Sequence, residues 1–164
     1  MWYQRAPIGT RVQRTFTINP TQNELLVTAQ VCAMDRQNRS YHCWTLLDTC
    51  SSKNFISSEG LAKKLQLPRK RCHIPIGAIN KTSTVAKYYT TATIRSQSGN
   101  YIRSFSFIII PTISNFIPDE LIDRKNLKIP RNIRLADSNF HRPSPVDMLL
   151  GAEPTLSLIC DKSI

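Results

Sequence analysis

Acidic residues are missing from the middle of this chain. No Asp or Glu occurs between Glu59 and Asp119, and the chain as a whole has 22 Lys and Arg against 11 Asp and Glu, a formal net charge of +11. The basic residues of the acid-free stretch are Lys63, Lys64, Arg69, Lys70, Arg71, Lys81, Lys87, Arg95 and Arg103. Such an excess attracts nucleic acid or an acidic partner. Because these side chains are spread out and form no recognisable binding motif, we favour a solvated basic surface and rank nucleic-acid binding last.

A long apolar run is also absent. The longest, Phe105 to Ile110, has the length of a strand and is interrupted by Ser106, whereas a membrane helix needs about 20 apolar residues. The first residues, Met1 to Arg5, contain no apolar signal core. We therefore expect an intracellular location and no membrane partner.

No cysteines are spaced as a Cys-x-x-Cys pair. The five cysteines are Cys32, Cys43, Cys50, Cys72 and Cys160. His42 and His73 each adjoin a cysteine, but their spacing fits no common zinc site. We expect buried or free thiols in a reducing compartment, with no metal and no cofactor.

The length of 164 residues and the hydrophobic content of 41% predict one domain with a core of its own. Residues 1–22 have little periodicity and contain Pro7, Gly9 and Pro20. We interpret them as a linker or an extended N-terminal arm, and residues 23–164 as the domain.

Period-two alternation predicts a first hairpin. In the segment Glu24–Met34 one face holds Leu25, Val27, Ala29, Val31 and Ala33. A polar turn follows at residues 35–40, and the returning strand, Tyr41–Leu47, ends at Asp48.

The remaining pattern predicts a mostly β chain with one or two short helices. Further strands are expected at Cys72–Ile76, Val85–Ile94 and Tyr101–Ile110. A short helix is expected between Ser58 and Pro68, capped by Ser57 or Ser58. A short helical turn is expected within residues 117–122, with Pro118 at its first position. The tail at residues 156–164 is expected to form a helix end or an interface strand.

The stretch Leu46-Leu47-Asp48-Thr49-Cys50-Ser51 places a carboxylate where a buried strand ends. A carboxylate there is costly unless it is hydrogen-bonded or has a chemical role. The stretch resembles the Leu-Leu-Asp-Thr-Gly-Ser segment of retroviral-type aspartic proteases. More closely, with Phe55-Ile56, the short helix and the loop from Leu135 to Phe140, the chain resembles the aspartic peptidase domain of BEL/Pao-type LTR retrotransposon polyproteins.

The resemblance implies a retropepsin-like acid protease barrel with one lobe per chain. It identifies Asp48 and Thr49 as catalytic residues and Cys50 and Ser51 as the turn that supports the aspartate. It implies a substrate-covering flap at Gly77, Ala78, Ile79 and Asn80. It also implies that the segment Leu149-Leu150-Gly151 runs beneath the catalytic turn, where glycine permits a close backbone approach.

By the same resemblance, the function is that of an aspartic endopeptidase acting on a peptide or polyprotein substrate, in the cytoplasm or in a retroelement particle. The chemistry needs two carboxylates roughly 3 Å apart that share one proton and activate water. Because the chain has one such stretch, each subunit of a homodimer would supply one Asp48.

Cys50 stands where the family has glycine. If the backbone there had positive φ, the side chain would cost on the order of 1 kcal/mol or more. The alternative is therefore a catalytically decayed protease-fold module that binds peptides or dimerises.

Overall fold

A computed structural model of the chain describes residues 25–58, 60–77, 83–97, 101–130 and 132–160. The strands are β1 (Thr28–Met34), β2 (Ser40–Leu47), β3 (Phe55–Ser57), β4 (Lys70–Gly77), β5 (Ser83–Ser96), β6 (Ile102–Ile110) and β7 (Met148–Leu150). The helices are α1 (Leu61–Lys64), the 3-10 helix η1 (Arg124–Asn126) and α2 (Ala152–Cys160). The predicted N-terminal arm, residues 1–22, lies outside the described residues.

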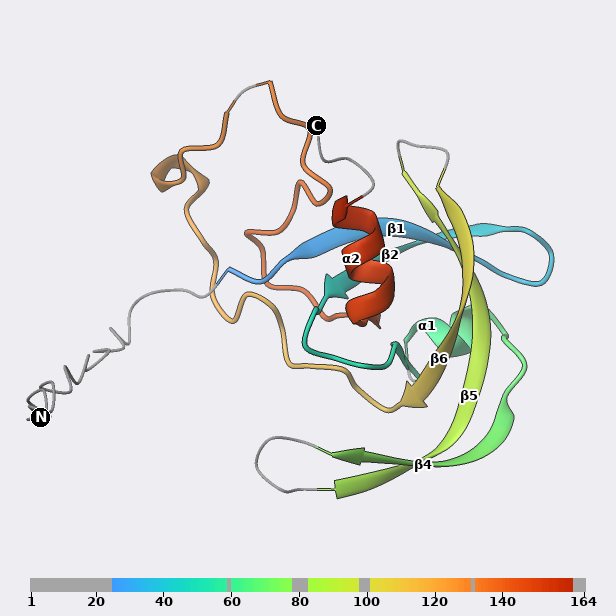
Figure 1. The fold of residues 1–164 in the computed structure, drawn as a ribbon. Helices are drawn as coiled ribbons and strands as arrows, with labels where there is room; N and C mark the ends of the chain where they lie inside the picture. The colour runs from blue at the N-terminus through green and yellow to red at the C-terminus, as the bar shows by residue number, and fades with distance from the viewer. Residues whose placement is uncertain (1–24, 59, 78–82, 98–100, 131, 161–164) are drawn as a thin grey trace, which may run out of the picture.

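The strands close into a barrel. Their order is β1-β2-β7-β3-β6-β5-β4, and a further pairing of β1 with β5 joins the ends, so six strands form a closed barrel and β4 extends from β5. Figure 1 shows the β4–β5 hairpin reaching away from the barrel body. The expected all-β barrel with short helices is therefore confirmed.

The core fills the barrel from several strands and α1. Its most deeply buried side chains include Ile56, Leu65, Ile94, Phe107 and Leu150. Alternation in β5 places Ala92 and Ile94 inside, and the bulky Phe107 of β6 belongs to the same cluster as these residues and α1. Period-two patterning explains these positions, because alternate residues of a strand face one side of the sheet.

The predicted first strand is too long. The strand begins at Thr28, and before it Leu25 and Val27 are 51% and 61% exposed. They therefore do not continue the buried face of Ala29, Val31 and Ala33. The start of β1 lies beside the loop at residues 135–140, where the Ala136 carbonyl accepts a hydrogen bond of 2.9 Å from the Gln30 N–H.

The short helix is confirmed, but its predicted cap is wrong. Gly60 is the N-cap of α1 and makes no side-chain capping bond. Ser57 belongs to β3, and its hydroxyl accepts a hydrogen bond of 3.3 Å from the Leu61 N–H. Leu61 and Leu65 are both buried, so packing rather than capping holds this four-residue helix.

The helical turn expected at Pro118 does not form. Ile117 makes an isolated antiparallel bridge to Ser144, with hydrogen bonds of 3.0 and 3.2 Å. Both backbone polar groups of Ile117 are thereby used by a distant segment, and the helical turn of this region is η1, a few residues later. Figure 1 shows this long connection between β6 and β7 on the side of the barrel where β1 begins.

Across the described ranges no helix has both the length and the apolar character that a membrane span requires.

Candidate functional site

Asp48 lies directly beyond the C-terminal end of β2. There β2 runs parallel to β7, with Leu47 opposite Leu150. The Asp48 N–H continues this ladder by donating a hydrogen bond of 2.9 Å to the Leu150 carbonyl. The parallel pair thus fixes the backbone of Asp48, while the residue as a whole is half-buried and stays within reach of solvent.

The carboxylate of Asp48 is held by its own turn. The Cys50 N–H donates a hydrogen bond of 2.8 Å to Asp48 Oδ1, the two-residue pattern that Asp side chains favour in turns. Among the described non-glycine residues, positive φ occurs only at Asn38 and Gln66. Cys50 therefore does not have the left-handed conformation that would make a β-carbon costly.

Gly151 lies against the far side of the turn. A β-carbon at this position would lie 2.7 Å from the Ser51 carbonyl oxygen and 2.8 Å from that of Lys53. The next residue, Ala152, donates its N–H to the same Ser51 oxygen at 2.7 Å. The segment Leu149-Leu150-Gly151 and the Asp48 turn are thus in direct backbone contact, which only glycine permits at this separation.

Two residues that sequence reasoning did not identify complete this contact. The Asn54 side-chain carbonyl accepts the Gly151 N–H at 2.8 Å, and the Thr155 hydroxyl donates to the Leu150 carbonyl at 2.9 Å. The Leu150 oxygen therefore accepts from both Asp48 and α2. No local pattern could reveal the Asn54 contact, because its partner is 97 residues away in the chain.

The surface of the turn is open. Thr49 and Cys50 are exposed, and the Ser51 hydroxyl donates to the Lys53 carbonyl at 2.8 Å. Beside the turn, the Leu47 N–H donates to the Val27 carbonyl at 2.9 Å. This bond brings the exposed apolar residues Leu25, Leu26 and Val27 alongside the strand that carries Asp48.

A second carboxylate, Asp137, is buried against β1 and β2. It is 3% exposed and accepts hydrogen bonds from the Thr28 hydroxyl at 2.7 Å, from the Asn139 N–H at 2.8 Å and from the Trp44 indole N–H. The loop that the sequence singled out at residues 135–140 therefore packs against the strand that carries Asp48. With three donors, Asp137 is a structural anchor.

The flap prediction lies mostly outside the described residues. Gly77 ends β4 and pairs with Ser83 of β5, so the intervening residues connect an antiparallel pair. Ala78, Ile79 and Asn80 are not described, and their role stays a prediction.

The thiols differ in accessibility. Cys32 and Cys43 are buried and Cys50 is exposed, and these three cysteines, like Cys72, are free. Burial raises the pKa of the Cys43 thiol, with a further contribution from the nearby Asp147 carboxylate. Within the described ranges, no three or more His, Cys, Asp or Glu side chains are grouped in a way that could hold a metal ion.

Comparison of the chain with protein-family models, curated proteins and solved structures finds no match.

Proposed function

We propose that this chain is an aspartic endopeptidase of retroviral type that acts as a homodimer on a polyprotein of BEL/Pao retrotransposon type. The observation that carries the proposal is the setting of Asp48: a carboxylate at the end of a buried strand, hydrogen-bonded by the Cys50 N–H and tied through its backbone to Leu150. The close contact of Gly151 with the turn supports the same function, because a catalytic carboxylate must be held rigidly.

The chemistry follows from pairing two such carboxylates. With one Asp48 from each subunit roughly 3 Å apart, both cannot ionise easily, and the pair shares one proton. The ionised carboxylate takes a proton from water as the water oxygen attacks the peptide carbonyl carbon. The protonated carboxylate donates toward the carbonyl oxygen, and a later proton transfer to the amine releases it.

The surroundings of the turn favour a dimer. Thr49 and Cys50 are exposed at its tip, and Leu25 and Val27 expose apolar surface beside it. Exposed apolar surface next to a polar site commonly marks a protein interface. In the proposed dimer, two copies of this surface meet and bring the two Asp48 side chains face to face.

Cys50 is compatible with activity in this geometry. Its backbone N–H performs the hydrogen bond to Asp48 that a glycine would make, and its φ is not positive. Its exposed side chain adds a thiol where two turns would meet. That thiol is the feature that favours the second candidate function, a dimerising or peptide-binding module without turnover.

Cleavage of a peptide library at mildly acidic pH by the purified chain tests the proposal. We expect Asp48→Asn to reduce cleavage to background without changing the sedimentation coefficient, and Asp119→Asn, at an exposed position far along the chain, to cleave like the wild type. Cys50→Gly should cleave at least as fast as wild type. If the wild type and Cys50→Gly both form dimers and neither cleaves any peptide, the protease proposal is rejected in favour of the non-catalytic module.

A further inference from the structure

The outward face of β5 is polar and basic. The buried residues of this strand are Ala86, Thr90, Ala92 and Ile94. The residues that alternate with them along the strand therefore point away from the core. The outward side chains from Lys87 onward are Lys87, Tyr89, Thr91, Thr93 and Arg95.

Neighbouring strands extend this face. Lys70 of β4 is paired with Tyr89, and its Nζ lies 5.8 Å from the centre of the tyrosine ring. On β6, Ser104 and Ser106 are paired with Thr93 and Thr91, and the Ser104 and Thr93 hydroxyls are 2.7 Å apart. We call the surface formed by the β5 residues with Lys70, Ser104 and Ser106 the outer face.

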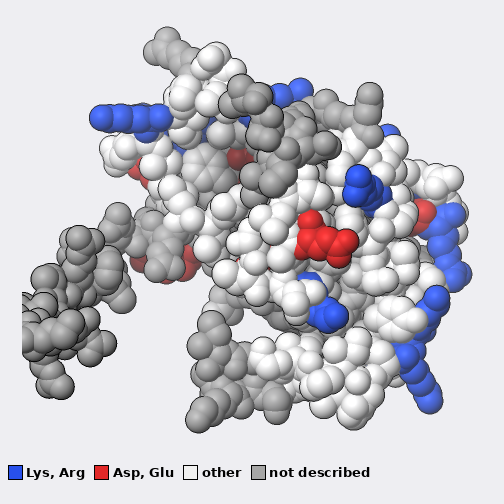
Figure 2. Space-filling view, in the orientation of Figure 1, with Lys and Arg blue, Asp and Glu red and all other residues white. Residues whose placement is uncertain are grey.

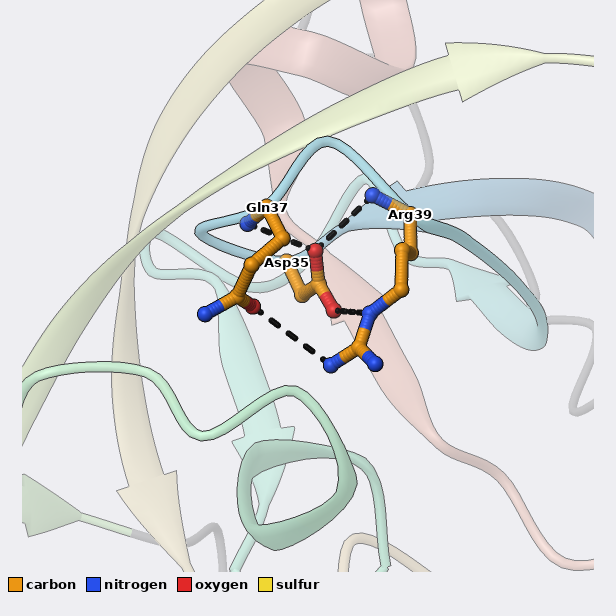
Figure 3. Close-up of polar contacts among 3 residues, drawn as sticks. All are labelled: Asp35, Gln37 and Arg39. Carbon is orange, nitrogen blue, oxygen red and sulfur yellow. Dashed lines mark hydrogen bonds and ion pairs between the residues drawn. The ribbon is translucent and has the colours of Figure 1, made fainter.

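No carboxylate within the outer face neutralises this charge. The chain has no Asp or Glu between Glu59 and Asp119, and the outer face lies wholly within that stretch. The carboxylate of the β1–β2 turn, Asp35, has a side chain that is 1% exposed and is bound by Arg39 at 2.6 Å. Figure 3 shows this carboxylate held by Gln37 and Arg39 of its own turn, so its charge is paired with that of Arg39.

A hollow continues the outer face at its Arg95 end. It has a volume of about 380 Å³, and its lining includes Thr91, Thr93 and Arg95 of the outer face together with Arg36, Pro68 and Asp35, whose carboxylate Arg39 binds. Figure 2 shows Lys and Arg side chains along the edge of the molecule where β4 and β5 lie in Figure 1. A basic surface thus leads into a depression that threonine hydroxyls help to line.

We propose that the outer face binds single-stranded nucleic acid. Lys70, Lys87 and Arg95 supply the positive charges that neutralise phosphates and release counterions. The threonine and serine hydroxyls supply donors of the kind that contact phosphate and sugar oxygens. The ring of Tyr89 offers an aromatic surface next to the Lys70 ammonium, the combination that sequence-tolerant single-strand binding uses.

The Arg95 end of the outer face is separate from the site of the proposed protease. The hollow lies at the hairpin turn before Ser40, whereas Asp48 follows the other end of β2. The strand has 8 residues, which separate its two ends by about 25 Å. A nucleic acid bound at the Arg95 end of the outer face would therefore leave the Asp48 turn open.

Fluorescence anisotropy of labelled 20-nucleotide dT and U oligomers, titrated with the full chain at about 50 to 200 mM salt, tests the proposal. The triple variant Lys70→Gln, Lys87→Gln, Arg95→Gln should bind at least about tenfold more weakly at the lowest salt. Each phosphate contact on a single strand contributes about 0.7 to the slope of log K against log salt. Losing three contacts should therefore reduce that slope by about 2. All three side chains are exposed, so circular dichroism and thermal unfolding should match the wild type.

A matched control distinguishes binding at the outer face from binding that depends only on the net charge of the protein. Lys125→Gln, Lys128→Gln, Arg142→Gln removes the same charges from exposed positions on the β6–β7 connection, and we expect less than about a threefold loss. Equal losses in the two triple variants, or no binding by the wild type at the lowest salt, would overturn the proposal. Displacement of the oligomer by polyglutamate at equal charge concentration would also overturn it, in favour of an acidic protein partner.

Discussion

Gly151 and Ser51 are in contact through their backbones, although 100 positions separate them in the sequence. A β-carbon on Gly151 would lie 2.7 Å from the Ser51 carbonyl oxygen, closer than real side chains approach. This contact joins the turn that carries Asp48 to the start of α2, so the stability of the barrel and the geometry of the candidate site depend on the same glycine.

Replacement of Gly151 by alanine should therefore destabilise the protein. The added methyl group meets backbone atoms, which cannot rotate away, and the expected loss in free energy of unfolding is about 2–4 kcal/mol. Gly77→Ala is the matched control, because a β-carbon added there would have nothing within 4 Å, and the change should stay within about 0.5 kcal/mol. Urea denaturation measures both. Equal midpoints would contradict the close contact.

Removal of the Asp137 carboxylate should leave two buried donors without their acceptor. The Thr28 hydroxyl and the Trp44 indole both donate to Asp137 Oδ2. At about 1–3 kcal/mol for each unsatisfied group, Asp137→Ala should cost about 2–6 kcal/mol of unfolding free energy. Asp119→Ala, at an exposed position, should cost less than about 0.5 kcal/mol. Chemical denaturation of the pair is the measurement, and a silent Asp137→Ala would show that the network carries no energy.

The Asp35 carboxylate should make stability depend on pH. Burial raises its pKa, but hydrogen bonds from the Arg39 side chain and from the Arg39 and Gln37 N–H groups outweigh burial and lower it below the ordinary value of 3.8. A lowered folded-state pKa contributes stability that is present above the unfolded value and is lost as pH falls through the folded value.

The corresponding measurement compares the wild type with Asp35→Asn. The difference in urea midpoint between them should be largest at about pH 5 to 7 and should shrink as pH falls below about 3.8. A difference that stayed constant over that range would show that the Asp35 charge contributes nothing.

The thiols should react in order of their exposure. In the native chain Cys50 should react first with a thiol reagent, because it is exposed, while Cys32 and Cys43 should react only on unfolding. The raised pKa of Cys43 lowers its thiolate fraction further. Mass spectrometry of labelled peptides locates each site, and Cys50→Ser should remove the fast phase.

The same labelling reports on the proposed dimer. If two Asp48 turns meet, the labelling rate of Cys50 should fall as protein concentration rises, whereas the rate of the half-buried Cys72 should not change. A Cys50 rate independent of concentration in a sample that sediments as a dimer would place the interface elsewhere.

The sequence by itself determined the main strands and where several of them end. Alternating residues predicted the β1–β2 hairpin and the strand β5, and the apolar run that ends at Ile110 predicted β6, because both patterns are local signals of a strand. It also placed Asp48 at the end of β2, since an apolar run that stops at a carboxylate is a local signal. The position of Leu149-Leu150-Gly151 beneath the Asp48 turn was predicted only through the resemblance to aspartic proteases, because no local pattern links these two segments.

Only the tertiary structure decided what surrounds those residues. The closure of β1 on β5, the anchoring of Asp137 by Trp44 and the Asn54 bond to Gly151 join segments far apart in the chain, for which local pattern carries no signal. The helical turn expected at Pro118 does not form for a similar reason, because the backbone N–H and carbonyl of Ile117 are hydrogen-bonded to Ser144. Basic residues that look scattered along the sequence, such as Lys70 and Arg95, are gathered on one face because pairing brings their strands together.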